Sequence, residues 1–165
     1  MKRGVLVAVA LGAVLAGYLY WASDERQIRR LLDGVADAVS QEEGAGGVVG
    51  LAEVAGLTRY LAPDVTFEPG APFRAITGAQ EIVSTVGRLR AVMTAVDLTF
   101  SDPQIAVDGR TASVRTTATL ILRDRDGAQS VDTRETLIAL EERETGWVIT
   151  TARAQIGTPA AAGLR

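Results

Sequence analysis

The second half of the chain alternates apolar and polar residues over four long segments, and this pattern constrains the fold more than any other feature. The segments cover residues 96–107, 111–124, 129–142 and 146–156. The gaps between them hold the pairs Asp108-Gly109, Asp126-Gly127 and Thr145-Gly146, which are typical of hairpin turns. Strands of this length exceed the usual five or six residues, so the sheet has to twist and curl. The sequence therefore predicts a strongly curved, mainly antiparallel sheet with one concave face.

Three amphipathic patterns in the first half of the chain predict helices that cover this face. The first helix begins at Ser23, the second fits residues 48–61, and the third opens with a capping-box pattern at Thr77 and Gln80. Between the second and third helices, short strands are expected at residues 65–67 and 73–76. The prediction is an α+β fold in which three N-terminal helices pack on the curved sheet.

An uncharged apolar stretch, residues 4–22, precedes these helices. As a helix it would be about 28 Å long, close to the hydrocarbon thickness of a bilayer. Tyr18, Tyr20 and Trp21 gather at one end, where aromatic rings prefer the membrane–water interface. We expect a single transmembrane helix that anchors the chain. The alternatives are a cleaved signal peptide and a very apolar buried helix.

The charges around this stretch indicate an orientation. Lys2 and Arg3 precede it and favour a cytoplasmic N-terminus, which places the rest of the chain on the extracytoplasmic side. Lys2 is the only lysine, and with abundant Ala and Gly this is typical of a GC-rich bacterial genome. The expected localisation is the bacterial inner membrane, with a single pass. The expected division is an anchor at 1–23, a domain at 24–157 and a flexible tail at 158–165.

The composition excludes several kinds of chemistry. The chain has no Cys, so disulfides, thiolate catalysis and cysteine-based metal sites are excluded. It has no His, which removes serine–histidine triads and imidazole bases. Its net charge of −3 does not favour nucleic-acid binding. We therefore expect no cofactor, no metal site and no nucleic-acid partner.

Three short stretches of the chain carry a family resemblance. They are Leu61-Ala62-Pro63-Asp64-Val65-Thr66-Phe67-Glu68, Ile76-Thr77-Gly78-Ala79-Gln80-Glu81-Ile82 and Gly146-Trp147-Val148-Ile149. Together with the order of elements, they resemble the nuclear transport factor 2-like superfamily, which includes SnoaL-like and ketosteroid-isomerase-like proteins. The resemblance covers about residues 24–156. It implies a cystatin-like cone with a pocket inside the sheet, and commonly a homodimer formed through the outer sheet face.

The resemblance also implies where an isomerase of this superfamily would hold its catalytic groups. The general-base Asp follows the first strand, where this chain has Pro69-Gly70, and the neighbouring Glu68 would point the other way. The proton-donating Tyr of the first helix is replaced near Leu31, and Glu135 is the best match for the protonated Asp of the third long strand. The absence of the usual base argues against an isomerase.

Strand alternation suggests a candidate ligand pocket. If Trp147 faces the helices, the same alternation turns Thr151 and Arg153 inward, and matching Glu135 to the isomerase position turns Thr133 inward as well. Arg153 could then bind a carboxylate, with Glu135 setting its orientation. Alternatively, these two residues form a cross-strand ion pair. Tyr60 at the end of the second helix could reach the pocket or belong to the core.

Two classes of function remain open. The favoured class is a membrane-anchored, non-catalytic module that binds a small ligand or assembles with other membrane proteins. The alternative is a small-molecule isomerase, cyclase or hydrolase that uses Glu135 as its acid or base, which would require a carboxylate in a dry cavity. The sequence identifies no catalytic residue.

Overall fold

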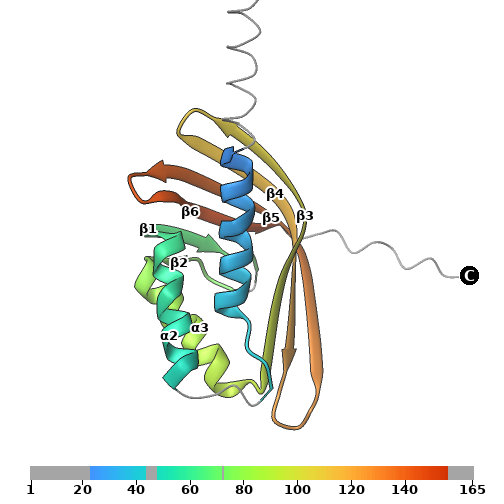
Figure 1. The fold of residues 1–165 in the computed structure, drawn as a ribbon. Helices are drawn as coiled ribbons and strands as arrows, with labels where there is room; N and C mark the ends of the chain where they lie inside the picture. Colours follow the sequence, from blue (N-terminus) through green and yellow to red (C-terminus); the bar gives the residue numbers. More distant parts are fainter. Residues whose placement is uncertain (1–22, 44–47, 72, 156–165) are drawn as a thin grey trace, which may run out of the picture.

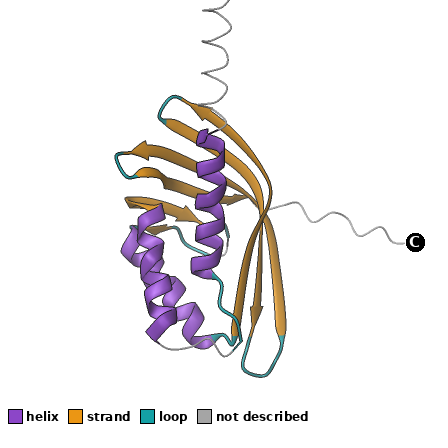
Figure 2. Ribbon diagram, viewed as in Figure 1, coloured by secondary structure: helices purple, strands orange, loops and turns teal. Residues whose placement is uncertain are grey.

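The structure is a computed structural model that describes residues 23–43, 48–71 and 73–155. It has two layers, with helices on one face of a six-stranded sheet (Figures 1 and 2). This is the predicted α+β arrangement. The anchor expected at residues 4–22, the glycine-rich segment 44–47 and the tail expected at 158–165 lie outside the described residues. Within the described ranges, no helix has the length and apolar character needed to cross a bilayer.

The sheet is mostly antiparallel. Its strands are β1 (Leu61–Glu68), β2 (Ile76–Thr77), β3 (Ala95–Asp108), β4 (Thr111–Arg123), β5 (Gln129–Arg143) and β6 (Gly146–Gln155). They are ordered β2-β1-β6-β5-β4-β3, and only the pairing of β1 with β6 is parallel. The four long strands end within one residue of the predicted bounds. The turns form as expected because Gly109, Gly127 and Gly146 supply positive φ angles of 58°, 81° and 113°.

Three α-helices cover one face of the sheet in the described part of the chain. The first spans residues 23–39, the second is α2 (Val48–Gly56), extended by the 3₁₀ turn η1 (Leu57–Tyr60), and the third is α3 (Ala79–Val92). The predicted capping box at the start of α3 is wrong. Thr77 belongs to β2, where it pairs with Thr66, and the N-cap is Gly78, which has no side chain to cap the helix.

The short strands also differ from the prediction. β1 begins four residues before the expected start, and β2 has only two residues. Pro63 is tolerated inside β1 because the pairing with β6 shifts between Leu61 and Thr66, so no ladder hydrogen bond needs a donor there.

Two β-bulges bend the long strands and reverse their alternation. In β3 the register shifts between Ser101 and Gln104, where Asp102 has a φ of 52°. In β6 it shifts because Ala139 pairs with Thr151 while Leu140 pairs with Ile149, which leaves Thr150 as the extra residue. Each bulge turns the following side chains to the opposite face. The resulting curvature of β3, β4 and β5 is plain in Figure 1.

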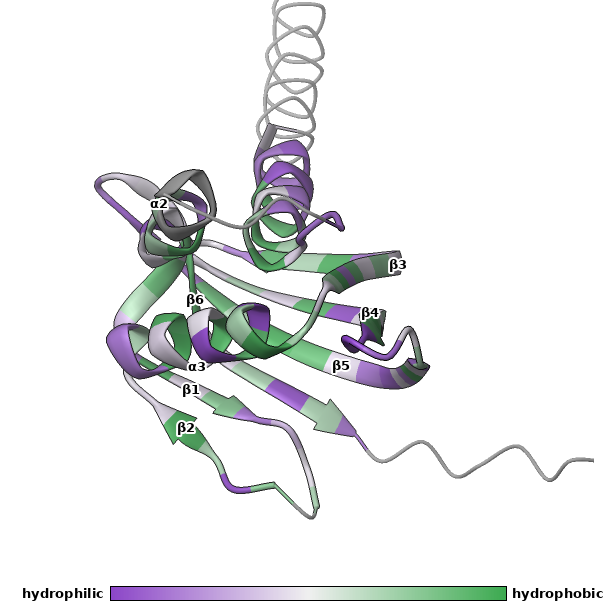
Figure 3. Cartoon of the chain, turned by 90° about the horizontal axis from the view of Figure 1, so that it is seen from below, coloured by the Kyte–Doolittle hydropathy of each residue, from purple (hydrophilic) through white to green (hydrophobic). Residues whose placement is uncertain are grey.

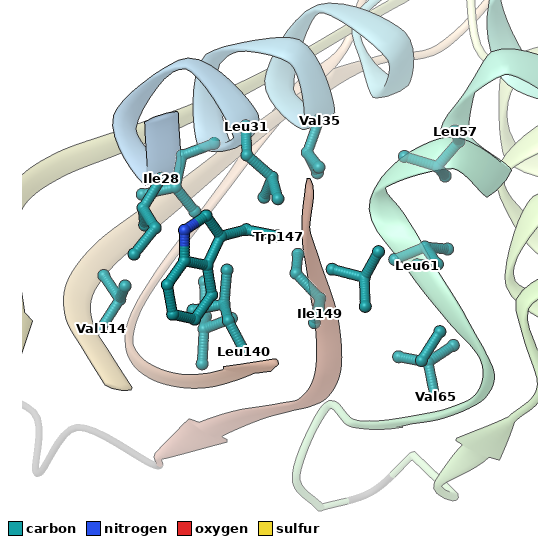
Figure 4. Close-up of a cluster of buried hydrophobic side chains, with 14 of the residues drawn as sticks. Ile28, Leu31, Val35, Leu57, Leu61, Val65, Val114, Leu140, Trp147 and Ile149 are labelled. Atoms are coloured by element: carbon teal, nitrogen blue, oxygen red, sulfur yellow. The ribbon is translucent and has the colours of Figure 1, made fainter. Parts of the chain in front are cut away.

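The core lies between the sheet and the helices. Trp147 and Leu140 pack beneath Ile28 and Leu31 of the first helix, and Val114 lies beside them (Figure 4). Viewed from below, α3 lies alongside β1 (Figure 3), and its partly buried apolar residues pack against the same core. Burying large aliphatic and aromatic side chains of this kind contributes about 1.5–3 kcal/mol each, and this holds the two layers together.

Candidate functional site

The residues expected to line a pocket from β5 lie on the outer face of the sheet. Thr136 and Ile138 are buried on the concave face, so their neighbours Thr133 and Glu135 point the other way and are exposed. The predicted inward orientation of Thr133 and Glu135 is therefore wrong. The apolar run 137–140 concealed the alternation, because either parity would have buried apolar residues.

The β6 residues are turned outward by the bulge. Trp147 and Ile149 face the helices as predicted, but after Thr150 it is Ala152, rather than Thr151 or Arg153, that packs against the core. The inward orientation predicted for Thr151 and Arg153 is wrong for this reason. The structure thus brings none of the four predicted strand residues to the concave face.

Arg153 forms an ion pair, but its partner is Glu68. Arg153 Nε lies 2.6 Å from Glu68 Oε2 and Nη2 lies 3.1 Å from Oε1, across the parallel pair of β1 and β6. The hydrogen bond from Arg153 lowers the pKa of Glu68 below its usual value, and the same bond raises the pKa of Arg153. Both groups are largely in water, so the pair adds little to stability.

Tyr60 belongs to the packing between helix and sheet. Its ring lies against the backbone of the first helix at Gly34, where an added Cβ would meet the Tyr60 hydroxyl at 2.2 Å. Tyr60 packs against the buried core, and Arg59 stacks over its ring at 4.7 Å. The structure therefore gives Tyr60 the core role that the sequence left open.

A different set of residues forms an apolar surface on the concave face. Ala112, Val114 and Thr116 of β4 and Val96 of β3 are buried, whereas the other inward-facing residues of these two strands are only partly buried. This concave patch consists of Leu98, Phe100, Ala118, Leu120 and Leu122. It lies toward the turn between β4 and β5, where the strands extend past the end of the 23–39 helix (Figure 1).

One cation borders the concave patch. Arg134 on β5 is directly opposite Ala118, which is opposite Phe100, so the three residues form one cross-strand row. The next row contains Leu98, Leu120 and Asp132. Among the inward-facing strand residues that the structure describes, Arg134 is the only Lys or Arg.

Arg134 is held in place from two sides. Its Nε lies 3.0 Å from both carboxylate oxygens of Asp132, and its Nη1 donates a 2.6 Å hydrogen bond to the carbonyl of Pro69. The side chain is 24% exposed. An oriented, half-buried guanidinium beside apolar side chains can bind an anionic group more strongly than a freely solvated one.

Two grooves lie near this region. The smaller, about 370 Å³, is lined by Glu68, Pro69, Gly70, Ala71, Phe73 and Ala75, and it adjoins Arg134 through the Pro69 carbonyl. The larger, about 870 Å³, follows the β3 edge beside Gln41. Its two cations are already paired, Arg90 with Glu53 and Arg123 with Glu43. The larger groove thus offers no uncommitted cation.

The sequence contained a signal for the concave patch, but it did not show on which face of the sheet these residues lie. Residues 118, 120 and 122 are apolar at a spacing of two, and the β4–β5 turn then places Arg134 beside them. Locating them on the concave face requires the register of β4 against β5. The possible homodimer through the outer face stays a prediction.

Comparison with known proteins agrees with the fold. A family model described as a SnoaL-like domain matches residues 22–153. No curated protein matches the chain.

Three solved structures from Novosphingobium aromaticivorans are similar. A candidate aromatic ring hydroxylase has a TM-score of 0.71 and 18% identity, with 84% of this chain and 92% of that chain covered. An NTF2-like protein with a cystatin-like fold has a TM-score of 0.69 and 16% identity, with coverages of 90% and 91%. A candidate scytalone dehydratase has a TM-score of 0.68 and 13% identity, with coverages of 81% and 84%. At these identities the likeness establishes the fold, a cystatin-like cone.

Proposed function

Because the chain belongs to the SnoaL-like domain family, we propose that it is a non-catalytic, membrane-anchored module that binds a small apolar molecule on its concave face. The observation that carries the proposal is the concave patch, whose five apolar side chains remain only partly buried on the face that the helices otherwise cover. A fully packed core would leave no apolar surface of this kind. Ligand sites are concave and mostly apolar, with a few polar groups that orient the ligand.

The placement of the carboxylates around the concave patch supports a non-catalytic role there. Acid–base catalysis needs a carboxylate that is shielded from water and within reach of the ligand. Glu135, the residue suggested for that work, is on the outer face. Asp132 faces the patch, but it is exposed and both of its oxygens accept hydrogen bonds from Arg134.

Membrane anchoring is the second part of the proposal. The apolar residues 4–22 are followed immediately by the helix that spans residues 23–39, so no described linker separates the two. The anchor would hold the domain next to the bilayer on its extracytoplasmic side. There the module would meet a ligand that is sparingly soluble in water, or a membrane-protein partner that delivers one.

Photolabelling with benzophenone tests the binding site. Benzophenone is apolar and uncharged, and on illumination it inserts into nearby C–H bonds. The full chain in lipid nanodiscs is labelled, digested with trypsin and mapped by mass spectrometry. We expect saturable labelling of the peptides 91–110 and 116–123, which contain the concave patch.

A matched pair of variants sharpens the test. Leu120→Asp places a charge in the patch and should abolish saturable labelling of both peptides. Ile121→Asp makes the same change on the next residue, which faces the outer side, and should leave labelling intact. Labelling that is equal in both variants, or that never saturates, would refute a binding site at the patch.

A further inference from the structure

We infer that the ligand of the concave patch carries an anionic group, a carboxylate or its like, which Arg134 binds. This inference rests on the proposed function and names the chemical class of its ligand: a small apolar body with one acidic group.

Arg134 lies at the border of the concave patch. Arg134 shares a cross-strand row with Phe100 and Ala118, so its guanidinium emerges at the border of the apolar surface rather than apart from it. Residues directly opposite on neighbouring strands have Cβ atoms about 5 Å apart. A ligand that covers the patch would therefore bring an attached acidic group within reach of Arg134.

The hydrogen bonds of Arg134 leave part of the guanidinium available. Nε is directed at Asp132 and Nη1 at the Pro69 carbonyl, whereas Nη2 donates to no described residue. Arginine has five N–H donors in a planar fork, and the edge formed by Nη1 and Nη2 can bind a carboxylate through two parallel hydrogen bonds. Asp132 and Pro69 thus orient the fork, while both N–H donors of Nη2 and one of Nη1 remain for a ligand.

The charge balance explains how an anion would be selected. Arg134 is the only cation among the described inward-facing strand residues, and Asp132 offsets its charge when no ligand is bound. An anionic ligand gains charged hydrogen bonds at a half-buried site, and hydrogen bonds of this kind are among the strongest in proteins. An uncharged ligand would gain only the apolar contact, and a cationic ligand would be repelled by Arg134.

Two probes that differ by one group test this inference. Benzophenone and 4-benzoylbenzoate share the photoreactive body, and only the second carries a carboxylate. Each is titrated against the full chain in nanodiscs, and the half-saturating concentration is read from labelling of peptides 91–110 and 116–123. In Arg134→Gln we expect half-saturation by 4-benzoylbenzoate to require about tenfold more probe, which corresponds to about 1.4 kcal/mol. Half-saturation by benzophenone should change less than twofold.

Arg115→Gln is the matched control. Arg115 lies on the outer face of β4 and makes no polar contact with the described residues, so its loss removes the same charge from the other side of the sheet. Because this change also removes a trypsin site, labelling of the second peptide is read from 111–123 in this variant. Neither probe should shift beyond twofold. Unchanged benzophenone labelling in Arg134→Gln also shows that the variant is folded.

The outcomes separate the two proposals. If both probes label the patch and Arg134→Gln alters neither, the anionic class is wrong and the binding function stands. If Arg115→Gln weakens 4-benzoylbenzoate as much as Arg134→Gln does, the effect is one of overall charge and the inference fails. If neither probe gives saturable labelling of the patch, the proposed function fails and the inference fails with it.

Discussion

Gly34 shows how one missing side chain permits a contact between distant parts of the chain. The residue lies inside the 23–39 helix, where glycine is ordinarily unfavourable by about 1 kcal/mol relative to alanine. An added Cβ would lie 2.2 Å from the Tyr60 hydroxyl oxygen and 2.5 Å from Cζ. Both atoms belong to a rigid ring packed against the core. The gain in helix propensity is therefore smaller than the cost of displacing Tyr60.

The prediction at this position is that Gly34→Ala destabilises the fold, by about 1–3 kcal/mol, through overpacking. Gly87→Ala is the control, because Gly87 is in α3 with nothing within 4 Å of an added Cβ. That variant should be more stable by about 0.5–1 kcal/mol. Urea unfolding of the two variants measures both signs, and a stabilising Gly34→Ala would contradict the packing described for Tyr60.

Arg90 connects several elements at one buried point. Its guanidinium donates to the Ala38 carbonyl at 3.1 Å, to Gln41 Oε1 at 2.9 Å and to Glu53 Oε2 at 3.0 Å. These acceptors belong to the first helix, the segment that follows it and α2. Only 4% of the Arg90 side chain is exposed, whereas Glu53 is half exposed. Arg90 therefore joins α3 to the other two helices.

Replacing Arg90 tests this connection between elements. In Arg90→Met the apolar volume is kept but three charge-assisted hydrogen bonds are lost, and we expect a loss of about 2–4 kcal/mol in the free energy of unfolding. Arg88→Met, two residues earlier, breaks only the exposed contacts with Glu81 and Thr85 and should cost less than about 1 kcal/mol. Similar costs for the two variants, measured by thermal unfolding, would show that the buried hydrogen bonds of Arg90 stabilise the fold no more than exposed contacts do.

The β3 edge of the sheet is protected from pairing with other chains. Gln41 forms a two-way backbone bridge with Val96, with N···O distances of 2.7 Å and 3.0 Å, and the Ser40 hydroxyl accepts from the amide of Leu98. Further along, the bulge at Asp102 is followed by Pro103, which has no amide hydrogen. Exposed edges of this length otherwise invite aggregation, and bulges and proline are common protections.

At the scale of the whole molecule, the proposed anchor would set how far the folded domain lies from the membrane. The proposed anchor leads directly into the first helix, and this helix packs across the sheet through Ile28 and Leu31 (Figure 4). A domain joined in this way would stay close to the bilayer surface rather than at the end of a long tether.

Alkaline carbonate extraction of membranes tests whether residues 4–22 anchor the chain. The full chain should stay in the membrane pellet after alkaline carbonate washing, and a variant without residues 4–22 should be released. Leu11→Arg with Leu15→Arg places two charges inside the stretch, which should oppose insertion at a cost of a few kcal/mol each. Release of the full chain by carbonate, or a mature N-terminus near residue 23, would contradict anchoring.

The sequence by itself determined the four long strands of this protein and the presence of its three helices. Hairpin turn pairs and period-two segments placed the four long strands, because glycine at positive φ and alternating burial are local requirements. Local pattern also placed the 23–39 helix and the start of α2.

Only the tertiary structure decided which residues face the helices. The bulge at Thr150 turned Arg153 outward, and the burial of Thr136 and Ile138 placed Glu135 on the outer face. Strand register brought Arg134 beside the concave patch. Side-chain direction in a strand reverses with every residue, so a shift of one position moves a whole set of residues to the other face. That shift is set by pairing between strands, which no single strand's sequence contains.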